Sequence, residues 1–571
     1  MYNVHINFHG GHPMKNIGFR VSYTNFGEKF SIPAAGNTHY AIECEETENA
    51  VKAKIIAKSR IELDKVDIIY DHIFESGDKF FGNGYQAWTT SREYTRQDKM
   101  VDMTPIAATK KLKKLAGISG DVRFVKFPKK SGEFFSHCYT YIRNGEKVFF
   151  IGSLSERQGF TVIYADMNKS LITLEKDVEG VILNEGESYE LFDVVKFTGT
   201  YDEVFDKYFE AMKLAKPRLE HMSGYTSWYN YFQKIDEKII IRDLNALDVA
   251  KDSVSIFQID DGYETFVGDW LDPNPAKFPK GMKYVADSIH EKGYMAGIWL
   301  APFSLQRTSR MYKEHPDWIL RDKYGLPILG VVAWGGAYTM DMYHPEARAY
   351  IKHFFDVILN EWGYDMVKLD FLYSQCMYPR NGKSRGTIMC EAMEFLRECC
   401  GDKFILGCGV PLGAAFGYVD ACRIGCDVDL KYTGKFYNAL HVNTEVPSAQ
   451  NSITNAIFRR HLSGRAFCND PDVFFLRYSN LDFTMDQKLI LAGVNHIFGD
   501  VLFVSDNAEE YTANDVEVLK KTFAKSEAKV ISAEFTEGTN IRIELEINGE
   551  NKAVEFDLAK GESNIREVLY N

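Results

Sequence analysis

Up to about residue 215, apolar and polar residues alternate over short stretches separated by turn residues. The stretches lie at 53–57, 66–70, 139–142, 148–152, 160–164 and 171–174. Asn-Gly pairs at 83–84 and 144–145 mark turns between them. A period of two is typical of strands with one buried face. The pattern predicts an antiparallel β-sandwich over residues 1–215.

After residue 215, short apolar runs alternate with stretches that have helical periodicity. Eight runs are predicted as buried strands, at 224–229, 254–260, 295–300, 366–371, 404–408, 421–426, 465–468 and 497–504. One intervening stretch, from Ala347 to Trp362, has apolar residues spaced by three and four and follows His344-Pro345. Such alternation predicts a (β/α)8 TIM barrel over 216–522. The long link 301–365 is expected to include an active-site loop.

The end of the chain returns to strand periodicity. Apolar and polar residues alternate over 529–537, 540–547 and 551–558, with turns at 537–538 and 548–549. This predicts a small antiparallel β domain over 523–571 that caps the barrel. The predicted fold class is therefore multidomain, α/β plus all-β.

Composition excludes several classes of protein. Of the 571 residues, 45% are hydrophobic and 26% charged, a globular balance that excludes bulk disorder. The net charge of −13 argues against nucleic acid and anionic membrane surfaces as partners. Aromatic residues make up 14%, which suits large cores and flat pockets for sugar rings. The ten cysteines do not suggest a disulfide framework in a chain of this length.

The sequence also carries an expectation about location. Residues 1–9 do not contain a charged leader followed by an apolar segment. No uninterrupted apolar stretch of ~18 residues is found either. We therefore expect a cytoplasmic protein, and the sequence leaves its oligomeric state open, a homo-oligomer included.

Candidate chemistry gathers where the predicted barrel strands end. Active-site groups of such barrels come from the carboxyl ends of the strands. The residues found there include carboxylates, a lysine, an arginine and tryptophans: Trp228, Asp260, Asp261, Trp299, Lys368, Asp370, Cys408, Gly409, Arg423, Asp427, Asp470 and Asp472. This concentration predicts a polar site with aromatic walls.

Lys368 and Asp370 are two residues apart on one predicted strand, so their side chains point to the same side. A lysine beside an aspartate lowers the pKa of the carboxyl group and keeps it ionised. An ionised carboxylate fixed at a strand end can act as a nucleophile. The alternative interpretation is a structural ion pair.

Asp427 follows Arg423 by four residues at the end of the sixth predicted strand. It is a candidate for the second carboxyl group of an acid/base pair, which retaining glycosidases hold about 5–5.5 Å from the nucleophile. The alternative interpretation is the N-cap of a following helix.

Asp260 and Asp261 form a carboxylate pair at a turn. The pair could bind a metal or accept hydrogen bonds from vicinal sugar hydroxyls. Because no histidine cluster stands at ligand spacing nearby, sugar binding is favoured and no metal is expected. Trp228 and Trp299 are candidate platforms for a sugar face, with packing inside the barrel as the alternative for each.

The order and spacing of several segments resemble glycoside hydrolase family 36, the α-galactosidase family, in its compact bacterial type. The resemblance covers most of the chain. Its segments are 83–88 (NGYQAW), 224–230 (GYTSWYN), 260–263 (DDGY), 268–270 (GDW), 277–282 (KFPKGM), 297–302 (GIWLAP), 315–318 (HPDW), 368–370 (KLD), 407–409 (GCG), 423–427 (RIGCD) and 469–472 (NDPD).

The resemblance implies a retaining exo-α-galactosidase that needs no metal or organic cofactor. Asp370 is then the nucleophile and Asp427 the general acid/base. The other implied positions bind the sugar: Asp260 and Asp261 at the 4- and 6-hydroxyls, Lys368 at the 3- and 4-hydroxyls, Cys408 and Gly409 at the 2-hydroxyl, and Trp88 and Trp299 as walls. Trp228 and Arg423 complete the predicted substrate-binding set.

Two other functions stay open. An α-N-acetylgalactosaminidase of the same family differs at the sugar 2-position, next to residues 408–411. A non-catalytic sugar-binding barrel is the second alternative, and the presence of both Asp370 and Asp427 argues against it. The predicted partner is a carbohydrate with a terminal α-galactose. The chain departs from the family pattern at Phe371-Leu372, where many members have a polar residue, which leaves the region beyond the first sugar open.

Overall fold

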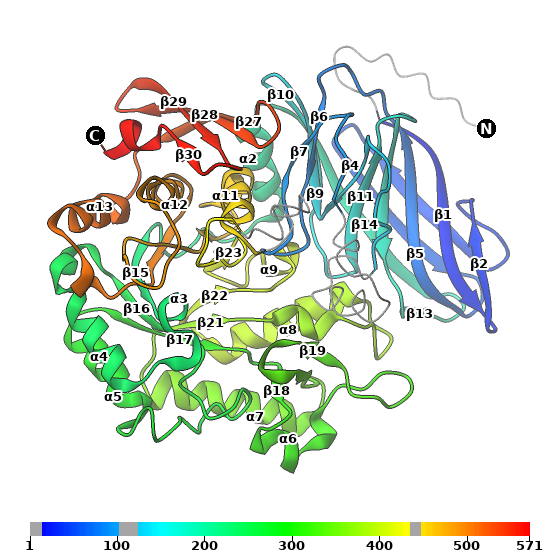
Figure 1. The fold of residues 1–571 in the computed structure, drawn as a ribbon. Coiled ribbons are helices and arrows are strands. Elements are labelled where there is room, and N and C mark those ends of the chain that lie inside the picture. Colours follow the sequence, from blue (N-terminus) through cyan, green and yellow to red (C-terminus); the bar gives the residue numbers. More distant parts are fainter. Residues whose placement is uncertain (1–13, 102–123, 434–446, 571) are drawn as a thin grey trace.

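The structure is a computed structural model that describes residues 14–101, 124–433 and 447–570. Two antiparallel sheets come first along the chain, followed by a curled parallel sheet with helices and then by a small antiparallel sheet (Figure 1). This order agrees with the sequence of β, α/β and β segments that the hydrophobic pattern predicts.

The first two sheets pack face to face. One has the strand order β2-β1-β5-β12-β11-β8, with β13 also paired to β5. Its strands are β1 (Lys15–Asn25), β2 (Glu28–Ile32), β5 (Ile61–Asp71), β8 (Glu133–His137), β11 (Phe160–Asp166), β12 (Leu171–Asp177) and β13 (Ile182–Leu183).

The other sheet has the order β3-β4-β14-β10-β9-β6-β7. Its strands are β3 (Tyr40–Glu46), β4 (Ala50–Ala57), β6 (Lys79–Gly82), β7 (Arg92–Tyr94), β9 (Tyr139–Asn144), β10 (Lys147–Ser153) and β14 (Ser188–Gly199). Val21 and Ile68 of the first sheet share one fully buried cluster with Ile55 and Ile151 of the second. Burial of these side chains holds the sheets together.

Within the described residues, the parallel sheet has nine strands in the order β24-β23-β22-β21-β17-β16-β15-β26-β25. Their bounds are β15 (Met222–Thr226), β16 (Ile256–Ile259), β17 (Met295–Leu300), β21 (Met366–Leu369), β22 (Phe404–Gly407), β23 (Ala421–Arg423), β24 (Cys468–Asp470), β25 (Val473–Phe474) and β26 (Val501–Val504).

The seventh predicted strand, at 465–468, is misplaced and divided. The sheet instead has β24 and β25, which pair with β23 and β26 respectively. Only Pro471 and Asp472 separate β24 from β25. Because β24 is the first strand in the order and β25 the last, residues 468–474 form both ends of the sheet. Proline lacks the N–H that a ladder needs, and Asp472 has a left-handed φ of +85°, which together interrupt the strand.

Several further strand boundaries differ from the prediction; β23, for example, ends at Arg423 rather than at 426. The segment predicted at 224–229 ends as a strand at Thr226, and Trp228 begins the short helix α3 (Trp228–Tyr231). The chain turns at Ser227, whose hydroxyl oxygen accepts a hydrogen bond from Asp260 N at 2.9 Å. At the eighth strand, Ile497 still belongs to helix α12, and the strand begins at Val501.

Helices follow the parallel strands and pack on the outside of the sheet (Figure 1). The predicted helix after His344-Pro345 is α7, in which Ile351, Phe354 and Phe355 are fully buried. The principal helices are α2 (Tyr201–Met212), α4 (Glu237–Ala246), α5 (Gly281–Glu291), α7 (Pro345–Asp356), α8 (Arg385–Cys400), α11 (Ala449–Phe458), α12 (Met485–Phe498) and α13 (Ala513–Phe523). Among the described residues, no helix is both long and apolar enough to span a bilayer.

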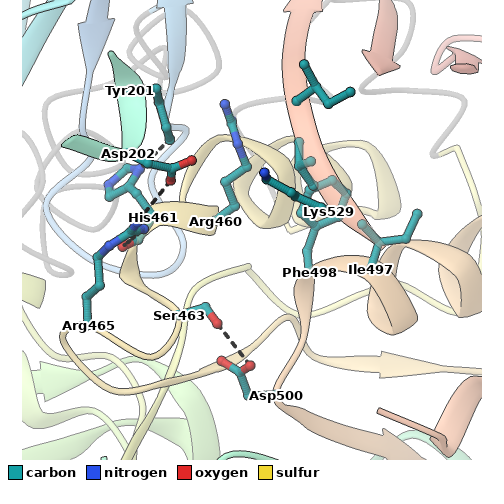
Figure 2. Close-up of a pocket in the computed structure, with 12 residues that line it drawn as sticks. Tyr201, Asp202, Arg460, His461, Ser463, Arg465, Ile497, Phe498, Asp500 and Lys529 are labelled. Carbon is teal, nitrogen blue, oxygen red and sulfur yellow. Dashed lines mark hydrogen bonds and ion pairs between the residues drawn. The ribbon is translucent and has the colours of Figure 1, made fainter. Parts of the chain in front are cut away.

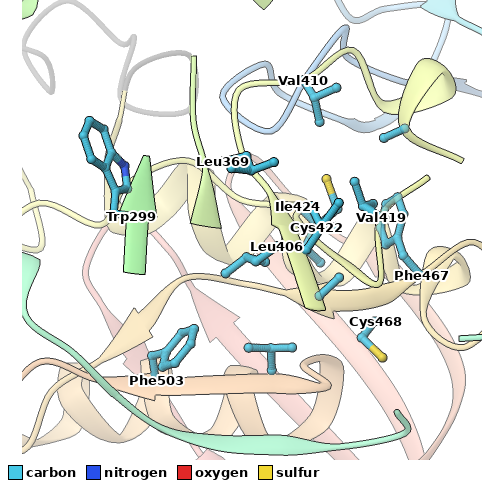
Figure 3. Packing of buried hydrophobic residues seen from close by; sticks show 14 of the residues in the cluster. Trp299, Leu369, Leu406, Val410, Val419, Cys422, Ile424, Phe467, Cys468 and Phe503 are labelled. Carbon is cyan, nitrogen blue, oxygen red and sulfur yellow. The ribbon is translucent and has the colours of Figure 1, made fainter. Parts of the chain in front are cut away.

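Neighbouring parallel strands contribute tightly packed apolar side chains (Figure 3). Leu369, Leu406, Cys422 and Ile424 have no exposed surface, and Phe503 has only 2%. Full burial of such side chains contributes roughly 1.5–3 kcal/mol each relative to exposure. This packing fixes the strands relative to one another, and therefore the residues at their ends.

The loop between β6 and β7 ties the antiparallel sheets to the parallel sheet. Arg459, which follows α11 and is fully buried, donates hydrogen bonds to the carbonyl oxygens of Gln86 at 2.8 Å and Ala87 at 3.1 Å. Asn455 of α11 donates to Ala87 O at 3.1 Å and accepts from Ser91 N at 2.7 Å. The backbone of this loop is thus held by side chains more than 360 residues away in sequence.

The C-terminal sheet joins the other parts of the molecule. Its strands are β27 (Lys529–Phe535), β28 (Asn540–Ile547), β29 (Glu550–Asp557) and β30 (Glu562–Ser563). Glu534 of β27 pairs with Lys79 of β6 at 2.6 Å. The ring of Phe535 stacks on Phe458 of α11 with 5.2 Å between centroids. The sheet therefore contacts both the first sheets and a helix of the α/β part.

We predict that Gly84→Ala destabilises the protein by about 1–3 kcal/mol, because a methyl group there overpacks the anchored loop. An added Cβ would lie 2.5 Å from Thr89 Cβ and 2.9 Å from Arg459 Nη2. Chemical denaturation followed by fluorescence measures the change. Gly18→Ala in β1 is the matched control, since its Cβ would meet no atom within 4 Å. Equal stability of the two variants would contradict the proposed anchoring.

Candidate active site

Parallel pairing brings the carboxyl ends of the strands together at one edge of the curled sheet. Trp299 is opposite Lys368, and Arg423 is opposite Asp470. Asp260 and Asp370 directly follow β16 and β21. Residues far apart in sequence thus meet at this edge, as the positions of the predicted strand ends suggested.

Both carboxylate oxygens of Asp370 are held by N–H groups. Oδ2 accepts a hydrogen bond from Trp299 Nε1 at 3.2 Å, and Oδ1 accepts one from Phe371 N at 2.7 Å. Gly409 lies so close that a Cβ there would be 3.3 Å from Asp370 Oδ1. These contacts fix the orientation of the half-buried carboxyl group.

The electrostatics of Asp370 correct the sequence-based prediction. Burial raises its pKa, Lys368 lowers it and Asp427 raises it again, so that the pKa is above its ordinary value rather than below it. Lys368 Nζ instead donates directly to Asp260 Oδ2 at 2.8 Å. Burial disfavours the lysine ammonium, but Asp260 and other negative groups outweigh this effect and raise the lysine pKa.

Asp260 is almost fully buried and has polar partners from three strands. In addition to Lys368, Gln258 Nε2 donates to its Oδ2 at 3.0 Å, and Asp261 N donates to its Oδ1 at 2.9 Å. Thr226 Oγ1 lies 3.5 Å from Oδ2. A buried carboxylate surrounded in this way is rigid and suited to accept hydrogen bonds from a ligand.

Asp261 is held by residues that the sequence analysis missed. Gln233 Nε2 lies 3.1 and 3.0 Å from its two carboxylate oxygens, and Trp334 Nε1 donates to Oδ2 at 2.8 Å. Burial, with a contribution from Asp260, raises the pKa of Asp261. Glu264 is buried nearby, and burial followed by the charge of Asp261 raises its pKa well above the usual value.

Arg423 connects Asp427 to the interior. Its guanidinium is buried at the end of β23, with Nη2 3.0 Å from Asp427 Oδ1 and Nη1 3.2 Å from Asp472 Oδ1. The Asp427 side chain is 48% exposed, so it faces the space outside the strand ends. Residues 428–433 are not helical, so the alternative that Asp427 is a helix N-cap is wrong.

Aromatic rings surround Asp370. Trp88, from the anchored loop, meets Phe371 edge to face with centroids 5.6 Å apart. Trp334 meets Trp299 at 5.9 Å and Phe371 at 5.3 Å. Trp334 belongs to the predicted active-site link 301–365, which forms a small sheet of β18 (Ser304–Gln306), β19 (Leu329–Val331) and β20 (Ala337–Thr339). Four separate segments therefore contribute rings to the wall.

Trp228 has a different environment from Trp88 and Trp299. It begins helix α3 and packs edge to face against Phe232, with centroids 5.1 Å apart. Phe232 has a left-handed φ of 48° although it is not glycine. Strain of this kind often marks functional loops. Neither observation tests the predicted contact of Trp228 with substrate.

Cys408 and Gly409 follow β22 beside the nucleophile candidate. Cys408 is 1% exposed, and burial followed by the charge of Asp370 raises its pKa well above the usual value. Gly409 has φ of +57°, and its carbonyl oxygen accepts from Tyr373 N at 2.8 Å. Pro411 and Leu412, which closely follow this turn, are buried.

A pocket of about 260 Å³ lies elsewhere, between α2, α12 and β27 (Figure 2). Asp500 lines it and directly precedes β26, so the pocket lies at the amino end of that strand. The candidate site is at the carboxyl ends and is therefore separate from this pocket. Within the ranges that the structure describes, no cluster of three or more His, Cys, Asp or Glu side chains is arranged to hold a metal ion.

Comparisons with known proteins agree with the fold. The sequence pattern of the melibiase family matches residues 226–386. A galactosaminidase of Flavonifractor plautii that acts on type A blood α-D-galactosamine is 32% identical over 151 residues, 25% of this chain. Alpha-galactosidase 1 of Pediococcus pentosaceus is 28% identical over 132 residues, 22% of this chain. The chain covers only 14% and 17% of the lengths of these two relatives.

The similarity to a solved structure is more extensive. The α-galactosidase TtGalA of Thermus thermophilus, solved with p-nitrophenyl α-D-galactopyranoside, aligns over 95% of this chain and 98% of its own. The TM-score is 0.68 at 23% identity, which shows a common fold. Together, the melibiase match and these similarities support a relationship to the α-galactosidases of glycoside hydrolase family 36.

Proposed function

We propose that the protein is a retaining exo-α-galactosidase that acts on terminal α-D-galactosyl residues of oligosaccharides or glycoconjugates. The observation that carries the proposal is the meeting of Asp260, Asp261, Asp370 and Asp427 at one edge of the sheet, next to aromatic rings. The named relatives that cleave α-galactosides support the substrate class.

The proposed fold is a (β/α)8 barrel over residues 216–522, closed through the segment of β24 and β25. The β-sandwich over 1–215 and the C-terminal β domain over 523–571 remain proposals as domains. A cytoplasmic location stays a prediction from the sequence, and the oligomeric state stays open.

Asp370 is the proposed nucleophile. Its Oδ atoms are oriented by the N–H groups of Trp299 and Phe371, which keep one face of the carboxylate directed at the sugar. Attack on the anomeric carbon forms a β-linked glycosyl-enzyme as the leaving oxygen departs. Bound water then attacks the same carbon and restores Asp370.

Asp427 is the proposed general acid/base. It first donates a proton to the leaving oxygen and later removes one from the attacking water. Its half-exposed side chain is accessible to both a leaving group and water. Asp427 is also near enough to raise the pKa of Asp370, as expected of paired carboxyl groups.

Asp260, Asp261 and Lys368 are the proposed partners of the galactose hydroxyls. Trp88 and Trp299 are proposed as walls of the ring, with Trp334 added from the structure. Trp228 and Arg423 remain members of the proposed substrate-binding set. We propose no metal or organic cofactor, because the two carboxyl groups supply both proton transfer and covalent attack.

Galactose is preferred to N-acetylgalactosamine in this proposal. The acetamido group needs extra room at the sugar 2-position, next to Cys408 and Gly409. Pro411 and Leu412 closely follow that turn and are buried, and we propose that they fill this room rather than form a shelf for the methyl group. A non-catalytic sugar-binding role is disfavoured because such a module needs no carboxyl pair.

We predict that Asp370→Ala lowers kcat by several orders of magnitude with little change in the folded structure, because the covalent step is lost. Added azide should restore part of the activity and yield the β-galactosyl azide. Turnover of p-nitrophenyl α-galactoside and analysis of the azide product measure both. Near wild-type turnover in the variant would remove Asp370 from this role.

We predict that Asp427→Ala slows substrates with poor leaving groups far more than activated aryl galactosides, because only the former need protonation. Azide as a substitute nucleophile should accelerate the second step. A series of aryl α-galactosides of graded leaving-group pKa measures the dependence. Equal losses across the series would show that Asp427 is not the general acid.

We predict a strong preference for the α-galactoside over the α-N-acetylgalactosaminide with the same leaving group. A steric clash at the 2-position costs at least ~3 kcal/mol, or about a hundredfold in kcat/KM. The ratio of the two kcat/KM values is the measurement. A ratio near one, or one that favours the acetamido sugar, would establish the alternative activity.

A further inference from the structure

Asp472 is a buried carboxyl group to which the mechanism above gives no role. It lies between β24 and β25 and is 3% exposed. Its φ of +85° is unusual for a residue with a side chain and costs conformational energy. The strain is held in place in part by Asp472 N, which donates to Asp470 Oδ1 at 2.8 Å. Strained backbone that is kept by its surroundings is typical of functional sites.

The contacts of Asp472 lead to the proposed acid/base from two sides. Its Oδ1 pairs with Arg423 Nη1 at 3.2 Å, while Arg423 Nη2 donates to Asp427 Oδ1 at 3.0 Å. Its Oδ2 accepts from Val428 N at 2.7 Å and from the Tyr229 hydroxyl. Asp472 therefore holds both the cation that contacts Asp427 and the peptide group next to it.

We propose that Asp472 is a positioning residue for Asp427: it takes part of the charge of Arg423 and fixes the backbone at Val428, so that Asp427 is oriented and able to carry its proton. The proposal rests on the role of Asp427 in the proposed function. Asp472 itself does not reach the substrate in this scheme and is not a catalytic residue.

One buried cation, Arg423, is shared by the carboxyl groups of Asp427 and Asp472. Arg423 is 1% exposed, so its charge is poorly screened by water. If Asp472 were neutral, the full attraction of Arg423 would act on Asp427 and favour its ionised form. An ionised Asp427 cannot protonate a leaving group. A negative Asp472 offsets the guanidinium and leaves Asp427 free to be protonated.

The groups that face Asp472 are Arg423, Asp427, Asp470 and Tyr229. Burial raises the pKa of Asp472 to about 7, with Asp427 and Asp470 acting in the same direction and Arg423 and Tyr229 opposing them. The negative charge of Asp472 is therefore present above this pH and is lost as the pH falls through it. The effect of this charge on Asp427 is therefore also present above that pH and lost below it.

The test is Asp472→Asn, which keeps the size of the side chain and suits a left-handed φ. The readout is kcat/KM against pH for two α-galactosides, one with a poor and one with an activated leaving group. We expect the alkaline limb to move to lower pH, and a loss of about tenfold or more for the poor leaving group against less than about threefold for the activated one.

Asp500→Asn is the matched control. Asp500 is a half-buried aspartate, whose pKa burial raises to about 6, and it accepts hydrogen bonds from Ser463 Oγ and Asn469 N. It lines the separate pocket at the amino end of β26 (Figure 2). This variant should lose stability while keeping the wild-type alkaline limb and leaving-group ratio.

Two results would overturn the positioning role: an unchanged alkaline limb in Asp472→Asn, or equal losses for both substrates. If this variant fails to fold, Tyr229→Phe removes one donor to Asp472 and should give a smaller shift in the same direction; no shift there overturns the role as well. A wild-type protein that does not cleave α-galactosides would instead refute the proposed function, and this inference with it.

Discussion

Everything proposed for this protein depends on buried charges being paired at the carboxyl ends of one parallel sheet. An unpaired buried charge costs several kcal/mol, whereas a pair with further hydrogen bonds can be accommodated. The Lys368–Asp260 pair and the contacts of Arg423 with two aspartates meet this requirement. Because each charge has fixed partners, the carboxyl groups cannot reorient freely, and the site is organised before a ligand arrives.

The antiparallel sheets contribute Trp88 to the same site through the loop between β6 and β7. Trp88 reaches Phe371 only because side chains after and within α11 hold the carbonyl groups of the loop. Hydrogen bonds to buried carbonyls are costly to lose, since the acceptor is then left without water or protein. The N-terminal part therefore contributes to the aromatic wall of the candidate site.

The sequence predicts the succession of strands along the chain and the gathering of carboxyl groups near their ends, because hydrophobic period is a local property. It fails where distant segments meet. Gln233 and Trp334 hold Asp261 from two loops, and no local pattern distinguishes them from surface residues. The divided strand at Pro471-Asp472 had a visible signal, since proline interrupts a ladder. The partner of Lys368 could not be predicted, because side-chain direction says nothing about which of two nearby aspartates lies closer.

The direct pairing of Lys368 with Asp260, rather than with Asp370, has a chemical consequence. A nucleophilic carboxylate locked in a tight ion pair with lysine would be stabilised before reaction and would attack less readily. In this structure Lys368 forms its ion pair with Asp260. The carboxylate of Asp370 is instead oriented by two neutral N–H donors. Lys368 still lowers the pKa of Asp370 from a distance, against the effects of burial and Asp427. The lysine thus favours the ionised form of the proposed nucleophile without neutralising it, while its direct partner is the carboxylate proposed to hold the sugar.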